Sequence, residues 1–339
     1  MKTAVRGPGW GLILVAMTLL LPACGRQRRN KEVAYVAAPQ AALRDRVAAV
    51  YEKTGTVKNG DRVEILERQA RFARVRTATG AEGWIEQRHL VSQQIFDSFQ
   101  KLVHDNQSDP VQATGITRND TNLHLTPGRD TEHLYQLSQG AKLALLTRAT
   151  AEKNLPGVPL KPAASAPPAG PKDAPKPTLE DWWLVRDAQG RVGWVLSRMV
   201  DLDVPLEIAQ YAEGQRIVAF FALNEVQDAD KKVPQYLVVL TEPKDGLPYD
   251  FDQTRVFTWN VKRHRYETAY REHHLNGFLP VTVDQESFDK EGTLPVFVLR
   301  VKDDNGSTLE RKYKLNTPIV RRVLAPGEQP QAPVRKKRH

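Results

Sequence analysis

The chain has 339 residues, is 40% hydrophobic and carries a formal net charge of +9. This length allows two or three domains with buried cores, and the 23 prolines predict long linkers. A single cysteine excludes a disulfide bond within the chain, so its stability must come from packing.

The positive charge is compatible with nucleic acid, anionic lipid or acidic cell-wall polymer as a neighbour. Part of it lies in two short runs, at 26–31 and 335–338, and such runs are typical of solvated tails. We therefore expect no nucleic-acid partner. Residues 326–339 are rich in proline and basic residues, which predicts a disordered tail.

The first 23 residues have the layout of an export signal. Lys2 and Arg6 precede an apolar run at 12–21, which is too short to span about 30 Å of hydrocarbon. The run leads directly into Leu21-Pro22-Ala23-Cys24-Gly25. The sequence therefore predicts export, with the only thiol of the chain just behind the signal.

This ending resembles the lipobox of bacterial lipoproteins, in which the cysteine receives diacylglycerol. The resemblance implies a signal peptide at 1–23, lipid on Cys24 and a tether at 24–30. Each buried methylene contributes about 0.8 kcal/mol, so two or more acyl chains hold a protein firmly at a membrane. We expect attachment to the outer membrane, or to the outer face of the cytoplasmic membrane. A plain secretory signal followed by a chance cysteine is the alternative.

Two segments, 31–91 and 111–202, repeat one pattern of apolar and glycine positions. The first closes with Gly80-Ala81-Glu82-Gly83-Trp84-Ile85, and the second closes with Gly190-Arg191-Val192-Gly193-Trp194-Val195. Alternating runs such as 62–66 and 73–76 predict short strands, and the glycines of Thr79-Gly80 and Gln189-Gly190 suit hairpin turns.

The repeat resembles bacterial SH3 (SH3b) domains. The second copy carries the resemblance best, in its start Asn122-Leu123-His124-Leu125-Thr126-Pro127-Gly128 and in its ending Asp187-x-x-Gly190-x-x-Gly193-Trp194-Val195. The resemblance implies two small SH3-like barrels, each able to bind peptidoglycan or a peptide. No cofactor is implied.

Three further segments complete the expected organisation. Between the copies, at 92–110, apolar residues at helical spacing follow a candidate cap at Ser92, which predicts a linker helix. An insertion at 154–178 is dominated by Pro, Ala, Gly and Lys and is expected to act as a spacer. Residues 203–325 contain seven candidate strands, which predict a separate β-sandwich or barrel of unrecognised family. The candidate strands are Arg216–Leu223, Tyr236–Thr241, Arg255–Asn260, Tyr266–Tyr270, Phe278–Val283, Val296–Val301 and Leu309–Leu315.

The sequence offers no recognisable catalytic centre. A cysteine peptidase needs a free thiolate, and Cys24 is committed to lipid if the lipobox is real. The local cluster Glu272-His273-His274 lacks the spacing of a zinc site, since adjacent residues on a strand face opposite sides. We expect no catalytic residue, no metal and no enzyme activity.

Aromatic side chains are the candidate ligand contacts, because they offer a large contact area at low entropic cost. We assign this role to Trp182 and Tyr135 in the second copy and to Phe72 in the first. Trp84 and Trp194 occupy the same place in both copies and are interpreted as structural core residues.

Together these observations predict an all-β, lipid-anchored envelope protein with two SH3-like barrels joined by a helix and a C-terminal β domain. Its expected function is non-catalytic binding or scaffolding, with peptidoglycan, a peptide or an envelope protein as the partner. The first alternative is an assembly factor acting through its C-terminal domain, and the second is an unrecognised cell-wall hydrolase. The oligomeric state is left open.

Overall fold

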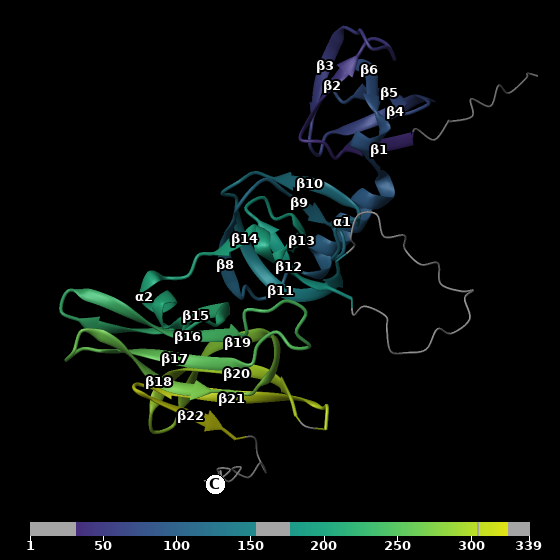
Figure 1. Cartoon of the computed structure of the whole chain (residues 1–339). Helices are drawn as coiled ribbons and strands as arrows, with labels where there is room; N and C mark the ends of the chain where they lie inside the picture. Colours follow the sequence, from purple (N-terminus) through teal and green to yellow (C-terminus); the bar gives the residue numbers. More distant parts are fainter. Residues whose placement is uncertain (1–31, 154–176, 304, 325–339) are drawn as a thin grey trace, which may run out of the picture.

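The computed structural model describes residues 32–153, 177–303 and 305–324. Almost all of its regular structure is antiparallel β, so the predicted all-β class is confirmed. Two seven-stranded sheets, each wrapped around buried side chains and called a barrel below, precede a two-sheet sandwich along an elongated molecule (Figure 1). The predicted signal peptide, Cys24, nearly all of the insertion and the basic tail lie outside the described residues.

The first barrel has its own core, formed by one face of each alternating strand. Val36, Leu43 and Val75 are each fully buried in it. Its strands are hydrogen-bonded in the order β3-β2-β6-β5-β4-β1-β7. Its elements are β1 (Glu32–Val36), β2 (Gln40–Arg44), β3 (Lys53–Lys58), β4 (Arg62–Gln69), β5 (Phe72–Thr77), β6 (Glu82–Glu86), the 3-10 helix η1 (Gln87–His89) and β7 (Leu90–Ser92).

A single helix, α1 (Gln93–Asp105), connects the two barrels. The hydroxyl of Ser92 accepts a 3.3 Å hydrogen bond from the backbone N–H of Ile95, which satisfies one of the free donors at the helix start. Phe96 stacks on Tyr35 of the first barrel with 3.9 Å between ring centroids. The apolar face of α1 therefore packs against the rest of the protein. None of the helices in the described part of the chain is long and apolar enough to cross a membrane.

The second barrel repeats the first strand for strand, in the order β10-β9-β13-β12-β11-β8-β14. The insertion falls between β11 and β12, and where it leaves the barrel the N–H of Lys153 donates to the carbonyl of Thr178 at 2.7 Å. Its elements are β8 (Ala113–Thr117), β9 (Thr121–His124), β10 (His133–Leu137), β11 (Lys142–Glu152), β12 (Leu179–Asp187), β13 (Val192–Leu196), η2 (Ser197–Met199) and β14 (Val200–Leu202).

The C-terminal region is a sandwich of two four-stranded sheets, β15-β16-β17-β18 and β19-β20-β21-β22. All seven predicted strands are confirmed, and each is longer than expected. The sequence analysis missed β22, a short edge strand that carries Arg321 and Arg322 and follows Pro318. The elements are α2 (Leu206–Ala209), η3 (Gln210–Ala212), β15 (Arg216–Asp228), β16 (Lys231–Thr241), β17 (Gln253–Asn260), β18 (Arg265–Glu272), β19 (Asn276–Phe288), β20 (Gly292–Lys302), β21 (Thr308–Asn316) and β22 (Ile319–Val323).

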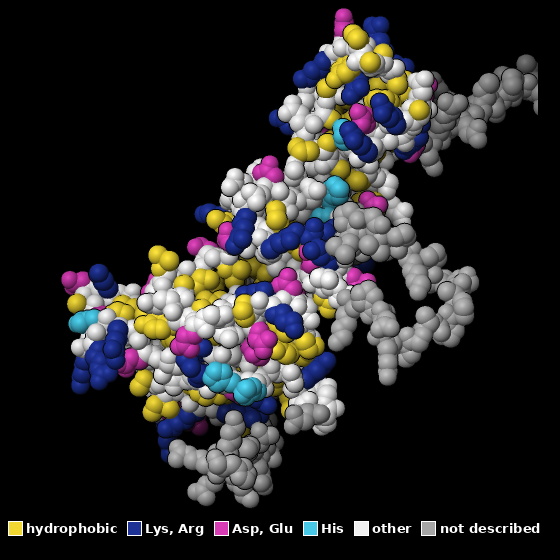
Figure 2. Space-filling model, viewed as in Figure 1, with side chains coloured by type: hydrophobic (Ala, Val, Ile, Leu, Met, Phe, Trp, Pro, Cys, Tyr) yellow, Lys and Arg dark blue, Asp and Glu magenta, His cyan; other side chains and the backbone are white. Residues whose placement is uncertain are grey.

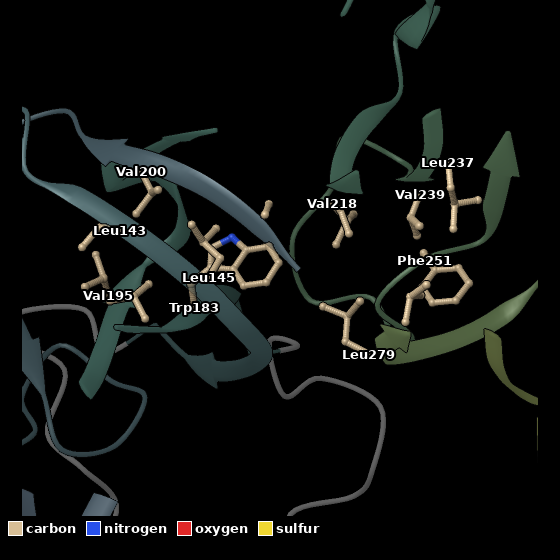
Figure 3. Close-up of a cluster of buried hydrophobic side chains, with 14 of the residues drawn as sticks. Leu143, Leu145, Trp183, Val195, Val200, Val218, Leu237, Val239, Phe251 and Leu279 are labelled. Carbon is tan, nitrogen blue, oxygen red and sulfur yellow. The ribbon is translucent and has the colours of Figure 1, made fainter. Parts of the chain in front are cut away.

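The second barrel and the sandwich share one continuous hydrophobic core. Figure 3 shows Leu143, Leu145 and Trp183 of the barrel on one side, with Val218 and Phe251 of the sandwich on the other. The first barrel keeps a separate core of its own. The second barrel is therefore joined to the sandwich as tightly as parts of one domain are joined to each other.

A buried carboxylate reinforces this junction. Asp181 on β12 has a fully buried side chain and forms an ion pair with Arg148 on β11. The same carboxylate accepts hydrogen bonds of 3.0 Å from Arg216 and from the backbone N–H of Gly246, both in the sandwich. Arg148 also donates to the backbone carbonyl of Asp250 at 2.7 Å. Because these charges lie out of water, each depends on its partners.

Asp181→Asn should destabilise the protein by about 3 kcal/mol, because it leaves the Arg148 guanidinium buried without its counter-charge. Denaturant unfolding would measure the loss. Asp245→Asn is the matched control: it removes a partner of Arg216 whose side chain is 44% exposed, and it should cost less than about 1 kcal/mol. Equal costs for both variants would contradict a central role for Asp181.

Candidate functional site

The two tryptophans expected in the barrel cores lie outside them. Trp84 and Trp194 are half-buried, whereas the next residues, Ile85 and Val195, are 1% and 0% exposed. The prediction that both tryptophans are core residues was wrong. Side chains alternate between the two faces of a strand, and the inward positions here belong to the glycine before each tryptophan and to the β-branched residue after it. At Gly193, a Cβ atom would come within 2.8 Å of the Leu123 side chain. The indoles must therefore point outward.

Trp194 nevertheless has a structural role. Trp194 packs against a cluster of buried side chains, Leu146, Leu184 and Val192, and so do Leu102 and Val103 of α1. The helix and the outward tryptophan therefore share one packed cluster on the second barrel. Trp84 lies outside that packed cluster.

Trp182, expected as a surface contact, is only 2% exposed. Its neighbour Trp183 faces the shared core, and the opposite face of the strand, which carries Trp182, is buried as well. His124 lies edge-on to the Trp182 ring at 5.3 Å, and burial, followed by the charge of nearby His133, lowers the pKa of His124. The expectation of an exposed Trp182 was therefore wrong.

An ion pair holds down the loop that follows His124. Arg129 in this loop donates two hydrogen bonds, of 2.7 and 2.6 Å, to the carboxylate of Glu180 on β12. The hydrogen bonds from Arg129 keep the pKa of Glu180 below its usual value. Thr131 closes the loop with a hydrogen bond to the backbone carbonyl of Thr126. The loop is therefore fixed to the barrel.

Tyr135 is also buried, with 8% of its surface exposed. It lies where the barrels meet: Phe99 of α1 approaches edge-on at 5.6 Å, and the Arg191 guanidinium lies 4.8 Å from its ring centroid. Beside it, the Asn59 side chain of the first barrel donates to the carbonyl of Leu134 at 2.6 Å. Tyr135 therefore packs the barrels together, and the expectation of an accessible ring at this position was wrong.

The first barrel presents a more open surface at the corresponding place. Phe72 occupies the strand position equivalent to Trp182 and is itself 4% exposed, so its ring is not an accessible platform either. The Arg44 guanidinium lies 5.1 Å from the Phe72 ring centroid and 4.2 Å from that of Tyr51. Tyr51 is 38% exposed and forms the outer part of this stack.

The loop at 45–52 projects beyond this stack. Its base is closed by Asp45, whose N–H donates to the carbonyl of Glu52 and whose carboxylate accepts from the Glu52 N–H at 2.8 Å. Between them runs Val47-Ala48-Ala49-Val50-Tyr51, in which Val50 is 87% exposed. Hydrophobic side chains are visible among charged ones over the first barrel in Figure 2. This loop and Arg44 form the candidate site, called the loop face below.

The chemistry of the loop face suits binding. Residues 45–52 contain no serine, histidine or cysteine, and their two acidic residues, Asp45 and Glu52, are hydrogen-bonded to each other at the base of the loop. An exposed apolar segment next to a guanidinium stacked on rings suits contact with a peptide or a sugar ring. The sequence analysis missed this face, although five consecutive apolar residues between charged ones were a readable signal.

No group of three or more metal-ligating side chains occurs within 32–153, 177–303 and 305–324. His273 and His274 lie with ring centroids 6.1 Å apart on the sandwich. Burial, followed by the charge of Arg271, lowers the pKa of His273.

Comparison with known proteins identifies a bacterial SH3 domain at 41–91. This match covers most of the first barrel, including the whole loop face. Among curated proteins, none matches the chain. The C-terminal sandwich is not part of the match.

Among solved structures, the chain is similar to an NlpC/P60 family protein from Bacillus cereus, at 12% identity and a TM-score of 0.23. That alignment covers 57% of this chain and 65% of the other, so the chain spans less than two thirds of that protein. It is also similar to NlpC2 from Trichomonas vaginalis, at 9% identity, a TM-score of 0.17 and coverage of 83% of this chain and 96% of that one. Such low TM-scores carry no argument about activity.

Arg129→Gln should destabilise the protein at neutral pH by about 2 kcal/mol, because it removes two hydrogen bonds to a carboxylate that is largely buried. The folded-state pKa of Glu180 is depressed, so this stability is present above its usual pKa of 4.5 and is lost as the pH falls through the folded value. Thermal unfolding from pH 7 downward should show the melting temperatures of the wild type and of Arg129→Gln converging in acid.

Arg68→Gln is the control for this comparison. It removes an ion pair with Glu32 whose side chains are 44% and 57% exposed, and it should change stability by less than about 0.5 kcal/mol. A difference between wild type and Arg129→Gln that persists undiminished in acid would show that Glu180 is not the responsible partner.

Proposed function

We propose that this chain is a cell-envelope lipoprotein that binds a cell-wall or peptide ligand through the loop face of its first barrel, without catalysis. The observation that carries the proposal is the bacterial SH3 match at 41–91, which coincides with an exposed apolar loop. Ala48, Ala49, Val50 and Tyr51 are exposed in succession, and a contiguous apolar surface of this kind suits contact with a partner.

The second barrel has a different role in this scheme. Its identical strand order supports a tandem pair of SH3b domains. In the second copy, however, the corresponding ring, Trp182, is buried and contacts His124, and the barrel shares a core with the sandwich. We propose that it serves as a rigid spacer that carries the first barrel.

Attachment through lipid on Cys24 completes the proposal. Confinement near a bilayer raises the effective concentration of the loop face against ligands in the same layer. Weak individual binding is then sufficient, which is consistent with a small exposed loop rather than a deep pocket.

Replacing Val50 by Ser together with Tyr51 by Ala should abolish retention on insoluble peptidoglycan. The two changes remove the largest exposed apolar contacts of the loop face and leave the core of the first barrel intact. Sedimentation with purified cell wall would measure retention of the chain from residue 25 onward. Shorter fragments ending near residue 202 are unsuitable, because they would expose the core shared with the sandwich.

Leu206→Ser is the control, since Leu206 is 86% exposed but lies on the sandwich. It should be retained like the parent protein. Undiminished retention of the loop variant would contradict the loop face as the wall-binding site. It would favour the alternative in which the C-terminal domain holds the partner site.

Cys24→Ala should release the protein from the membrane fraction, because no other thiol can take a thioether-linked lipid. Membrane fractionation of cells expressing each form, with mass spectrometry of the mature N-terminus, would test this. A variant that fractionates like the parent, or a parent with a bare thiol, would disprove the lipid anchor.

A further inference from the structure

A cavity of about 320 Å³ lies between the second barrel and the first sheet of the sandwich. Its apolar lining includes Trp183 and Val200 of the barrel and Val218 of the sandwich. Small-ligand sites of this volume occur preferentially where two structural units meet. The cavity lies at the junction of the second barrel and the sandwich, apart from the loop face, so its use does not depend on the function proposed for the loop face.

Four arginine side chains contribute to the wall of this cavity, and aspartates neutralise three of them. Each of these three guanidiniums lies within hydrogen-bonding distance of its carboxylate, so the pairs add little net charge. The neutralised pairs are Arg118–Asp201, Arg148–Asp181 and Arg216–Asp245.

The fourth arginine, Arg198, has no such partner among the described residues. Its nearest acidic atom is Oε1 of Glu180 at 3.9 Å, too far for a hydrogen bond. That carboxylate already accepts two hydrogen bonds from Arg129. The Arg198 side chain is 58% exposed, so its donors are available to a molecule that enters the cavity.

A second polar group in the cavity also lacks a partner. The hydroxyl oxygen of Ser197 is buried and makes no hydrogen bond within the described part of the chain. Ser197 lines the cavity together with Arg198, and both belong to η2. The hydroxyl is closed off from solvent, so it meets a ligand only when the Ser197 side chain turns toward the cavity. It then recovers the free energy that a buried hydroxyl without a partner costs.

We propose that this cavity binds the terminal carboxylate of a short peptide, with Arg198 as its counter-charge and Ser197 as a hydrogen-bond donor. Arg129 and Arg198 share the single carboxylate of Glu180, which leaves one positive charge in excess. That charge matches the single charge of a carboxylate better than a phosphate group, which carries about −1.5 to −2 at neutral pH. The apolar lining around Trp183 accommodates the side chain that precedes the carboxylate. Backbone and terminal-group capture of this kind is a general mode of peptide recognition.

Calorimetric titration of the chain from residue 25 onward with N-acetyl-trialanine should give saturable binding. The C-terminal amide of the same peptide should bind at least about tenfold more weakly, because it lacks the charge that pairs with Arg198. Arg198→Gln should weaken binding of the acid by a similar factor and leave the amide unaffected. Circular dichroism should show that the variant is folded, since Arg198 makes no hydrogen bond that the fold requires.

Arg88→Gln is the matched control, because Arg88 holds the equivalent place on η1 of the first barrel and its side chain is 76% exposed. It should bind the acid like the parent protein. The proposal is overturned if acid and amide bind equally, if Arg198→Gln binds unchanged, or if the acid fails to bind at millimolar concentration. Tighter binding of inorganic phosphate than of the peptide would also overturn it.

Discussion

The arrangement of the whole molecule depends on the buried carboxylate of Asp181. It is the point at which two strands of the second barrel and two segments of the sandwich share one charge. A charge removed from water is stable only with good geometry and full hydrogen bonding, so its partners must be held in fixed positions. The apolar core around it stabilises the junction through contacts that do not depend on direction. The ion cluster, whose hydrogen bonds are directional, fixes how the barrel and the sandwich are oriented.

The two barrels share one topology, but they differ in the surroundings of one equivalent strand position, which is Phe72 in the first barrel and Trp182 in the second. In the second barrel the residue there is a buried tryptophan that contacts His124, and the loop after His124 is held by an arginine–carboxylate pair. In the first, a phenylalanine lies beneath a guanidinium, and the loop extends into solvent. Ala70 stands at the place that Glu180 takes in the second copy, so the first loop has no equivalent anchor. One fold thus provides a fixed unit and an open one.

Much of the fold could be predicted from the sequence because alternation and turn glycines are local signals. The strand positions in the sandwich, the repeat and the cap at Ser92 are all encoded within a few residues of each other. Predictions about individual aromatic side chains were poor for the opposite reason. The Trp182 ring contacts His124, and the Tyr135 ring contacts Phe99 and Arg191. These partners are distant in sequence from the rings that they pack against.

The cavity between barrel and sandwich could not have been anticipated in this way, since its lining comes from residues 118 to 245. Its key feature is a carboxylate, Glu180, shared by Arg129 and Arg198, and a sequence does not display which charges share a partner. The repeat gave one usable hint, because Arg88 and Arg198 occupy equivalent places on η1 and η2. Only the neighbouring carboxylates distinguish them.

The hydrogen bond between Lys153 and Thr178 has a consequence for the evolution of this chain. It brings together the two points at which the Pro-rich insertion leaves and re-enters the second barrel, so the strands on either side are already closed against each other. The length of what lies between them is then nearly free of structural constraint, since loop-closure entropy grows only slowly with length. Related chains could therefore shorten, extend or replace this segment without changing the fold of the barrel.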